Sequence, residues 1–271
     1  MTAIPLTDSA VKNVKRALVA HFSSPTTKLQ SSHLSEALAA ACGFNSNAAL
    51  VAAMKVGPIN DPDYVLLDEA AFLERLTALS NCARNDNFSS FSFDKVHFSS
   101  PTETINTYSP AAKRIEFSTS TRKRAWRNMM VAGINEGIER RLFTVRRGDN
   151  RWPKPQSSSH SSRGIFVYEF SISSIPALAS VSAAGDAQLS IHVALWPTLG
   201  DTSWIRTGGA GFFAGEAFAT GYLERDEGAW LQVPSNAGGT PVFACRRKLL
   251  KYVSEIKIRP RGYADRGAFR L

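Results

Sequence analysis

The stretch "TSTRKRAWRNMMVAGINEGIERRLF", residues 119–143, decides the fold of the larger part of the chain. Its apolar and small residues recur at helical spacing. At about 100° per residue, one broad face collects Trp126, Met130, Gly133, Ile134, Gly137 and Ile138. Asn128, Asn135 and Glu139 fall on the opposite side, which we expect to face solvent. The stretch predicts one long amphipathic helix that carries its positive charge at its two ends.

Short runs with period-two alternation surround this helix, which is typical of strands. They cover residues 91–98, 114–118, 164–172, 189–196, 216–225 and 229–234. Residues 226–228, "DEG", predict a hairpin turn, and the serine-rich residues 153–164 predict a loop. Residues 241–262 predict a short helix that runs into a strand and a basic tail. The pattern predicts an α+β fold with a mainly antiparallel sheet.

The preceding part of the chain has a helical pattern from Thr7 to about residue 80. Helix caps are expected at Asp8, at Ser31 or Ser32 and at Asp68, a short helix is expected to start at Ser46, and Gly43 suits a left-handed helix end. Residues 81–90, "NCARNDNFSS", are polar and indicate a boundary. We therefore expect a helical module over residues 1–85 and an α+β domain over residues 86–271.

Positive charge is concentrated in two blocks of the sequence. The 271 residues carry a formal net charge of +9, with a pI near 9.7. Residues 113–154 hold twelve Lys and Arg against four Asp and Glu, and residues 245–271 hold nine against two. Such segregation favours a polyanionic partner and predicts a nucleic-acid-binding surface. We expect it to be formed by Arg122, Lys123, Arg124, Arg127, Arg146, Arg147, Arg151, Trp152, Lys154, Arg246, Arg247, Lys248, Arg259 and Arg261.

Arg122, Lys123 and Arg124 lie where the helix dipole disfavours cations. The hydroxyls of Thr119, Ser120 and Thr121, the free N–H groups of the first turn and the three cations would together form a phosphate site. A solvated run of charges is the alternative. Beside the basic blocks, Trp152 and Tyr263 could stack on unpaired bases, or belong to the core.

Other motifs narrow the classes of function. Cys42, Cys82 and Cys245 form no CxxC pair, which suits a reducing cytoplasm, and no apolar run is long enough to predict a signal peptide or a membrane span. Without metal-ligand spacing, P-loop or dinucleotide fingerprint, we expect no cofactor and no metal. His192 lies in an alternating run and is interpreted as a strand residue.

The stretch "ACGFNSNAAL", residues 41–50, resembles the second helix-turn-helix of AraC-type regulators. That resemblance implies DNA binding through a helix that begins at Ser46, although this helix has no Lys or Arg before Lys55. A helical hairpin that packs against a partner or a second copy is the alternative. Residues 31–54 and 64–76 are also similar to uncharacterised proteins of bacterial plasmids and integrative elements, which implies a mobile-element context.

A catalytic alternative rests on "SEIKIRP", residues 254–260. Glu255 and Lys257 would share one face of a predicted strand and resemble the acid-x-lysine pair of PD-(D/E)xK nucleases, which implies Mg²⁺-dependent cleavage. Asp226 would supply the preceding acid. The leading hypothesis is instead a cytoplasmic, non-enzymatic accessory or regulatory protein that binds nucleic acid, with DNA the expected form. A protein-binding inhibitor or adaptor is the third possibility.

Overall fold

The computed structural model describes the chain in segments. These are residues 2–22, 29–56, 63–80, 91–96, 98, 120–145, 166–184, 188–198, 205–207, 210–212, 215–224, 230–232 and 242–265. The chain forms two compact units, one of residues 1–101 with Arg246–Lys248, and one of residues 102–245 with 249–271. We call them the N-terminal unit and the C-terminal unit.

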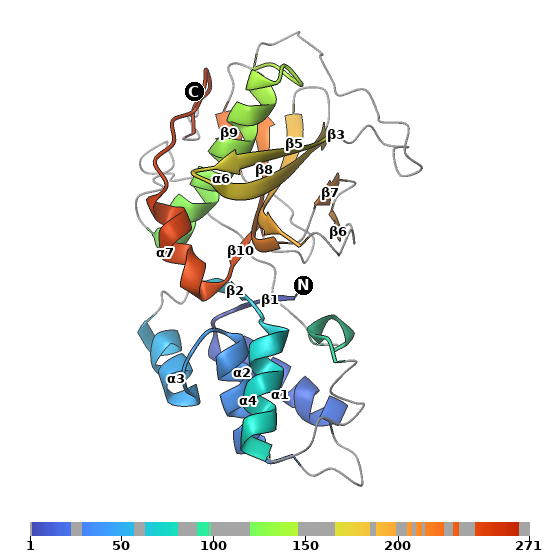
Figure 1. Cartoon of the computed structure of the whole chain (residues 1–271), viewed down its shortest axis with the longest axis vertical. Helices are drawn as coiled ribbons and strands as arrows, with labels where there is room; N and C mark the ends of the chain where they lie inside the picture. The colour runs from blue at the N-terminus through green and yellow to red at the C-terminus, as the bar shows by residue number, and fades with distance from the viewer. Residues whose placement is uncertain are drawn as a thin grey trace. The chain divides into compact units, whose positions relative to one another are not determined.

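The N-terminal unit is mainly helical (Figure 1). Its elements are β1 (Ala3–Pro5), α1 (Asp8–Phe22), α2 (Ser31–Ala41), α3 (Asn47–Val56), β2 (Tyr64–Leu66), α4 (Glu69–Ser80) and the short 3-10 helix η1 (Phe93–Lys95). The two strands pair antiparallel, with Ile4 opposite Val65. Phe91 and Phe93 pack against Phe72 of α4 in the core. Residues beyond the predicted boundary at 85 therefore contribute to this unit.

Side chains cap the starts of α1, α3 and α4, but not of α2, whose N-cap Gln30 makes no side-chain cap hydrogen bond, so the expected cap at Ser31 or Ser32 is wrong. Asp68 Oδ1 accepts a hydrogen bond from Ala71 N at 3.1 Å, which confirms the predicted cap, and Ser46 Oγ accepts one from Ala49 N at 3.2 Å at the start of α3. Gly43 has a φ of 80° after α2, as expected of a left-handed helix end. The expectation for Asp8 is wrong by one residue, because the oxygen that accepts from Ala10 N belongs to Thr7.

The C-terminal unit combines one long helix, α6 (Thr121–Glu139), with an antiparallel sheet, which confirms the predicted α+β fold. The sheet strands are β3 (Phe166–Ile172), β4 (Ile175–Ala183), β5 (Gln188–Pro197), β8 (Gly215–Glu224), β9 (Trp230–Gln232) and β10 (Phe243–Cys245). They pair in the order β10-β8-β5-β4-β3, and β9 adds to β8. Strands β6 (Ile205–Thr207) and β7 (Ala210–Phe212) form a separate pair, and α7 (Arg247–Glu255) follows β10.

Helix α6 lies against one face of the sheet (Figure 1). The Trp126 indole donates to Thr220 O at 2.8 Å. Gly133 allows close approach, because a Cβ there would come within 2.5 Å of Val193 Cγ2. The expected apolar face is confirmed, but the expected solvent face is wrong for two residues: Asn128 and Asn135 are only 4% and 8% exposed. The helix is therefore buried on more than one side.

Several strand predictions need correction. Residues 93–95 form η1, and residues 256–260, which follow α7, are neither helix nor strand. The predicted strands at 164–172, 189–196, 216–225 and 229–234 correspond to β3, β5, β8 and β9, with β8 and β9 antiparallel as the hairpin at 226–228 requires. Strand β4 and the short strands β1, β2, β6, β7 and β10 were not predicted. The predicted strand at 114–118 and the loop at 153–164 lie outside the described residues.

Candidate nucleic-acid interface

The basic start of α6 does not form the predicted phosphate site. Ser120 is the N-cap of α6. Its Oγ accepts a hydrogen bond from Lys123 N at 3.0 Å, so this hydroxyl already caps the helix. The Arg122 side chain is 2% exposed, and burial lowers its pKa to about 10. The guanidinium is therefore inside the protein. Lys123 and Arg124 are half-buried, and Arg124 contacts the Thr121 hydroxyl at 3.4 Å.

Arg127 is also engaged within the unit. Its Nε and Nη2 lie 2.6 Å and 2.5 Å from Asp265 Oδ2, and its Nη1 donates to Ile258 O at 2.7 Å. The two side chains of this ion pair are only 17% and 19% exposed. Arg127 thus ties the C-terminal segment to α6, and the expectation that it contacts phosphate is not supported by its position.

Residues 256–265, which we call the C-terminal strap, run alongside α6 (Figure 1). Asn135 Nδ2 donates to Arg259 O at 2.8 Å, and Asn135 Oδ1 accepts from Arg261 N at 3.0 Å. The Tyr263 hydroxyl lies 3.1 Å from Val131 O and 3.2 Å from Asn135 Oδ1. Just before the strap, Asn128 Nδ2 contacts the carbonyl oxygens at 253 and 254. Buried side chains of α6 therefore fix the backbone of the strap.

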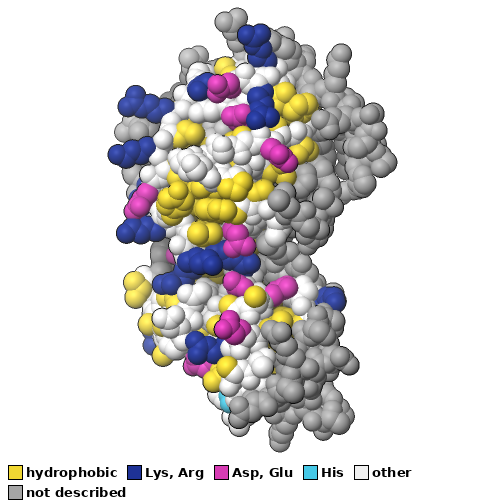
Figure 2. Space-filling view, in the orientation of Figure 1, with side chains coloured by type: hydrophobic (Ala, Val, Ile, Leu, Met, Phe, Trp, Pro, Cys, Tyr) yellow, Lys and Arg dark blue, Asp and Glu magenta, His cyan; other side chains and the backbone are white. Residues whose placement is uncertain are grey.

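The strap presents its cations to solvent. Ile256 and Ile258 pack against the sheet core, whereas Lys257, Arg259 and Arg261 are exposed. In extended backbone such alternate residues are roughly 6.6 Å apart. Arg261 Nη1 pairs with Glu139 Oε2 at 2.9 Å, and both side chains remain 57% exposed. Figure 2 shows Lys and Arg side chains along the edge of the unit that this segment occupies in Figure 1.

The first three basic residues of the C-terminal block have other environments. Arg246 Nη1 donates to Leu66 O at 3.2 Å. Arg247 Nη1 donates to Gly43 O at 3.2 Å, and its guanidinium carbon lies 4.2 Å from the centre of the Phe44 ring. These two arginines therefore stabilise the N-terminal unit, to which they belong, while Lys248 is exposed.

The hairpin of α2 and α3 has the expected tight turn, but its second helix is poorly suited to contact DNA. Glu36 Oε2 of α2 accepts from Asn47 N at 3.1 Å, so a carboxylate occupies the helix start where a phosphate would bind. The exposed face of α3 is apolar except for one lysine and consists of Ala48, Ala49, Val51, Ala52, Lys55 and Val56. This surface favours contact with protein over contact with a polyanion.

The geometry expected of the nuclease alternative is not present. Glu255 is the last residue of α7, where its Oε1 lies 3.9 Å from Lys251 Nζ, and Lys257 belongs to the strap. The strand that was to place Glu255 and Lys257 on one face therefore does not exist. No group of three His, Cys, Asp or Glu side chains able to hold a metal ion occurs within the described segments. Asp226 lies outside them.

Other predicted residues also fall outside the described part of the chain. They are Arg146, Arg147, Arg151, Trp152 and Lys154. Tyr263 is described, but it is 8% exposed and its hydroxyl is bonded to α6, so it offers no face to a base. Sequence reasoning missed the aromatic pair Trp196 and Tyr252, whose ring centres lie 6.4 Å apart. An aromatic residue among the lysines of "RRKLLKYVSE" was the available signal for Tyr252.

His192 lies in β5, as interpreted from its alternating run. Its side chain is 4% exposed, and its Nε2 lies 3.4 Å from Ser190 Oγ. Burial lowers the pKa of His192 to about 3, so the ring is neutral at physiological pH. Cys42 and Cys245 are buried, and burial raises the pKa of Cys42 to about 12, which disfavours the reactive thiolate.

Comparison with known proteins gives no assignment. No protein-family model matches the chain, and no curated protein or solved structure shows significant similarity to it. In the described part of the chain, every helix is too short or too polar to cross a membrane.

Proposed function

We propose that this chain is a nucleic-acid-binding accessory or regulatory protein, without catalytic activity of its own, that holds the phosphate backbone along the C-terminal strap. DNA is the expected form of nucleic acid. The observation that carries the proposal is the outward row of Lys257, Arg259 and Arg261 on a backbone anchored by buried side chains of α6. A mobile-element context remains a prediction from sequence resemblance alone.

Physical reasons support this use of the strap. Phosphate contacts contribute affinity through release of counterions, which requires cations that can reach the ligand. The strap cations are exposed, and their backbone is already ordered, so binding does not have to order the segment first. Their spacing is comparable with that of successive phosphates along one strand. Lys251, whose side chain is 85% exposed on α7, extends the positive surface beyond the strap.

Fluorescence anisotropy tests the proposal with labelled duplex DNA, single-stranded DNA and RNA, each titrated from about 50 to 200 mM salt. The variant is Lys257→Ala/Arg259→Ala. The matched control is Lys12→Ala/Arg16→Ala, which removes two exposed cations from α1. We expect the salt slope on duplex DNA to become shallower by about 0.9 per lost phosphate contact, or about 0.7 on a single strand, in the strap variant alone.

Two outcomes would contradict the proposal. One is the absence of binding to all three nucleic acids at about 50 mM salt, where electrostatic affinity is high. The other is an equal change in the strap variant and the α1 control, which would mean that net charge matters and the strap does not.

A protein-binding role is the second candidate, favoured by the exposed apolar face of α3. Val51 and Val56 are 36% and 87% exposed, and Glu36 disfavours an anionic ligand at the same helix start. Contact with a partner protein or with a second copy is compatible with nucleic-acid binding by the strap. Val51→Asp should abolish association measured by sedimentation velocity with and without nuclease treatment, while Lys12→Asp should leave it unchanged.

A further inference from the structure

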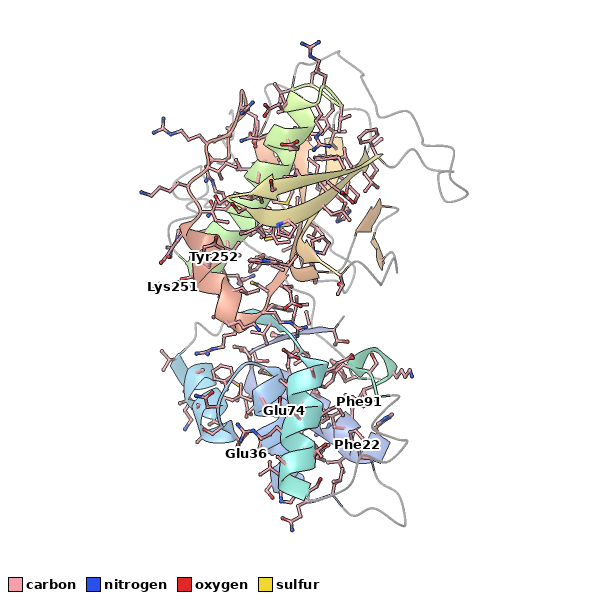
Figure 3. All side chains as sticks on the ribbon, viewed as in Figure 1. Phe22, Glu36, Glu74, Phe91, Lys251 and Tyr252 are labelled. Atoms are coloured by element: carbon pink, nitrogen blue, oxygen red, sulfur yellow. The ribbon has the colours of Figure 1, made fainter. Side chains whose placement is uncertain are left out.

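The aromatic pair at one end of the sheet offers a surface that phosphate binding does not use. Tyr252 of α7 is 49% exposed, and Trp196 of β5 is half-buried beside it. The ring centres are 6.4 Å apart with 38° between the ring planes. Figure 3 shows Tyr252 next to Lys251 on α7. The pair thus combines accessible aromatic surface with an adjacent exposed cation.

The backbone at Trp196 is strained. Its φ is 45°, in the left-handed region that a bulky side chain rarely adopts. The ladder between β5 and β8 pairs Leu195 with Ala217 and Pro197 with Gly215, so the left-handed residue lies between two regular pairs. Strain of this kind concentrates at ligand-binding positions, where the surrounding fold maintains it. Burial of the ring does not account for it, because the Trp196 ring remains half-buried only.

The pair lies close to the cations of the strap along the chain. Tyr252 and Lys257 are five residues apart, so their Cα atoms are separated by at most about 18 Å. Helix α7 ends at Glu255 between them, which shortens that distance further. A strand a few nucleotides long could therefore contact the strap through its phosphates and the aromatic pair through a base.

We propose that Trp196 and Tyr252 form a stacking platform for an unpaired base, so that the nucleic acid bound along the strap is single-stranded. This inference rests on the proposed function. Every base has an aromatic face, so stacking needs no particular sequence. In a duplex these faces are covered by neighbouring base pairs and are not available to the platform. The phosphate row and the platform together select strands with exposed bases.

The test compares oligonucleotides that differ only in their bases. Labelled oligo-dT, oligo-rU, an abasic DNA strand of equal length and the corresponding duplex are titrated against the full chain at one salt concentration. We expect the base-bearing strands to bind at least about 5-fold more tightly than the abasic strand, as stacking on an aromatic side chain predicts. The oligo-dT and oligo-rU arms tell whether the strand is DNA or RNA.

Two variants assign the effect to the platform. Tyr252→Ala should lose about 5-fold or more in affinity for oligo-dT and bind the abasic strand as the wild type does. Tyr252→Phe should retain the wild-type preference, because its ring is kept. The salt slope of Tyr252→Ala should equal that of the wild type, since no phosphate contact is removed. Quenching of tryptophan fluorescence by oligo-dT should weaken in Trp196→Leu.

The outcomes separate this inference from the proposed function. Equal binding of base-bearing and abasic strands, tighter binding of the duplex, or an unchanged preference in Tyr252→Ala would overturn the stacking platform while nucleic-acid binding by the strap stands. Failure of every oligonucleotide to bind at about 50 mM salt would overturn the proposed function and, with it, the platform.

Discussion

Two helix caps of the N-terminal unit bond to groups nearby in the sequence, whereas two buried amides of α6 in the C-terminal unit bond to distant ones. Ser46 and Asp68 each accept from an amide three residues ahead. In contrast, Asn128 contacts a carbonyl 125 positions away, and Asn135 one that is 124 positions away. The first kind of bond fixes a helix end, and the second fixes the end of α7 and the strap on α6.

This difference indicates which polar residues have the largest effect when they are removed. A helix cap at the surface replaces hydrogen bonds that water would otherwise make, so its loss has a modest effect. A buried amide that joins two segments leaves several polar groups unsatisfied when it is removed. In this molecule the buried amides also hold the segment that carries the exposed cations. Three predictions test this contrast, from the largest expected effect to the smallest.

Asn135→Ala should lower the free energy of unfolding of the C-terminal unit by about 3 kcal/mol, because its bonds to the strap backbone are lost in a buried site. Tryptophan fluorescence during urea denaturation measures this selectively, since all five tryptophans belong to that unit. Nucleic-acid affinity should fall as well. Glu139→Ala, which removes an exposed ion pair with Arg261 on the same helix, should lower stability by less than about 1 kcal/mol. Equal losses of stability in the two variants would contradict the expected difference between a buried amide and an exposed ion pair.

The second prediction concerns the pH dependence of the C-terminal unit. The pKa of His192 is lowered to about 3 in the folded protein, against about 6.5 for an unperturbed histidine. Below about pH 6.5 the unfolded chain binds a proton that the folded chain does not, so this contribution is complete above that pH and is lost as the pH falls. Between about pH 6 and pH 4 the free energy of unfolding should decrease by about 2 kcal/mol from this residue.

Urea denaturation at several pH values, again followed by tryptophan fluorescence, isolates that effect as the difference between the wild type and His192→Asn. The variant should show a flatter dependence on pH. His21→Asn, on the exposed part of α1, should reproduce the wild-type curve. An identical slope in His192→Asn and the wild type would show that this histidine titrates normally.

Glu36→Gln should have the smallest effect. Loss of the carboxylate at the start of α3 should weaken that helix by less than about 1 kcal/mol, and nucleic-acid affinity should not change. Hydrogen exchange of the α3 amides measures the first effect and anisotropy the second. Glu74→Gln, on the exposed side of α4, is the matched control (Figure 3). A gain in DNA affinity confined to Glu36→Gln would identify α3 as a DNA-contacting helix. It would contradict the expectation that α3 does not bind nucleic acid.

The same contrast explains how much could be predicted from sequence. The cap at Asp68, the helix start at Ser46 and the helix end at Gly43 were predictable because each depends on neighbours within a few residues. The run that became β3 was predictable because only part of it is buried, whereas β5 and β8 are buried on both faces and were recognised from their sequence pattern alone. Strand β4 was missed because its many Ala and Ser residues give little contrast between its two faces.

The strap was predicted to be a strand for a physical reason. Alternation of Ile256, Lys257 and Ile258 predicts that one side of the segment is buried, and this is confirmed. The alternation does not predict whether the element that covers this side is a strand or a helix. Here the neighbour is α6, which offers amide side chains instead of a backbone ladder. The burial of Arg122 was likewise unpredictable, since it depends on the packing of the entire α6 surface.

The contacts of Arg246 and Arg247 affect the order in which the chain folds during its synthesis. Their bonds to Leu66 and Gly43 join positions 180 and 204 residues apart. At roughly 5 to 20 residues per second, about 10 to 40 s separate synthesis of the Phe44 ring from arrival of the guanidinium that covers it. The helices of the N-terminal unit can form during that interval, but their contacts with Arg246 and Arg247 form only after these two residues have been synthesised.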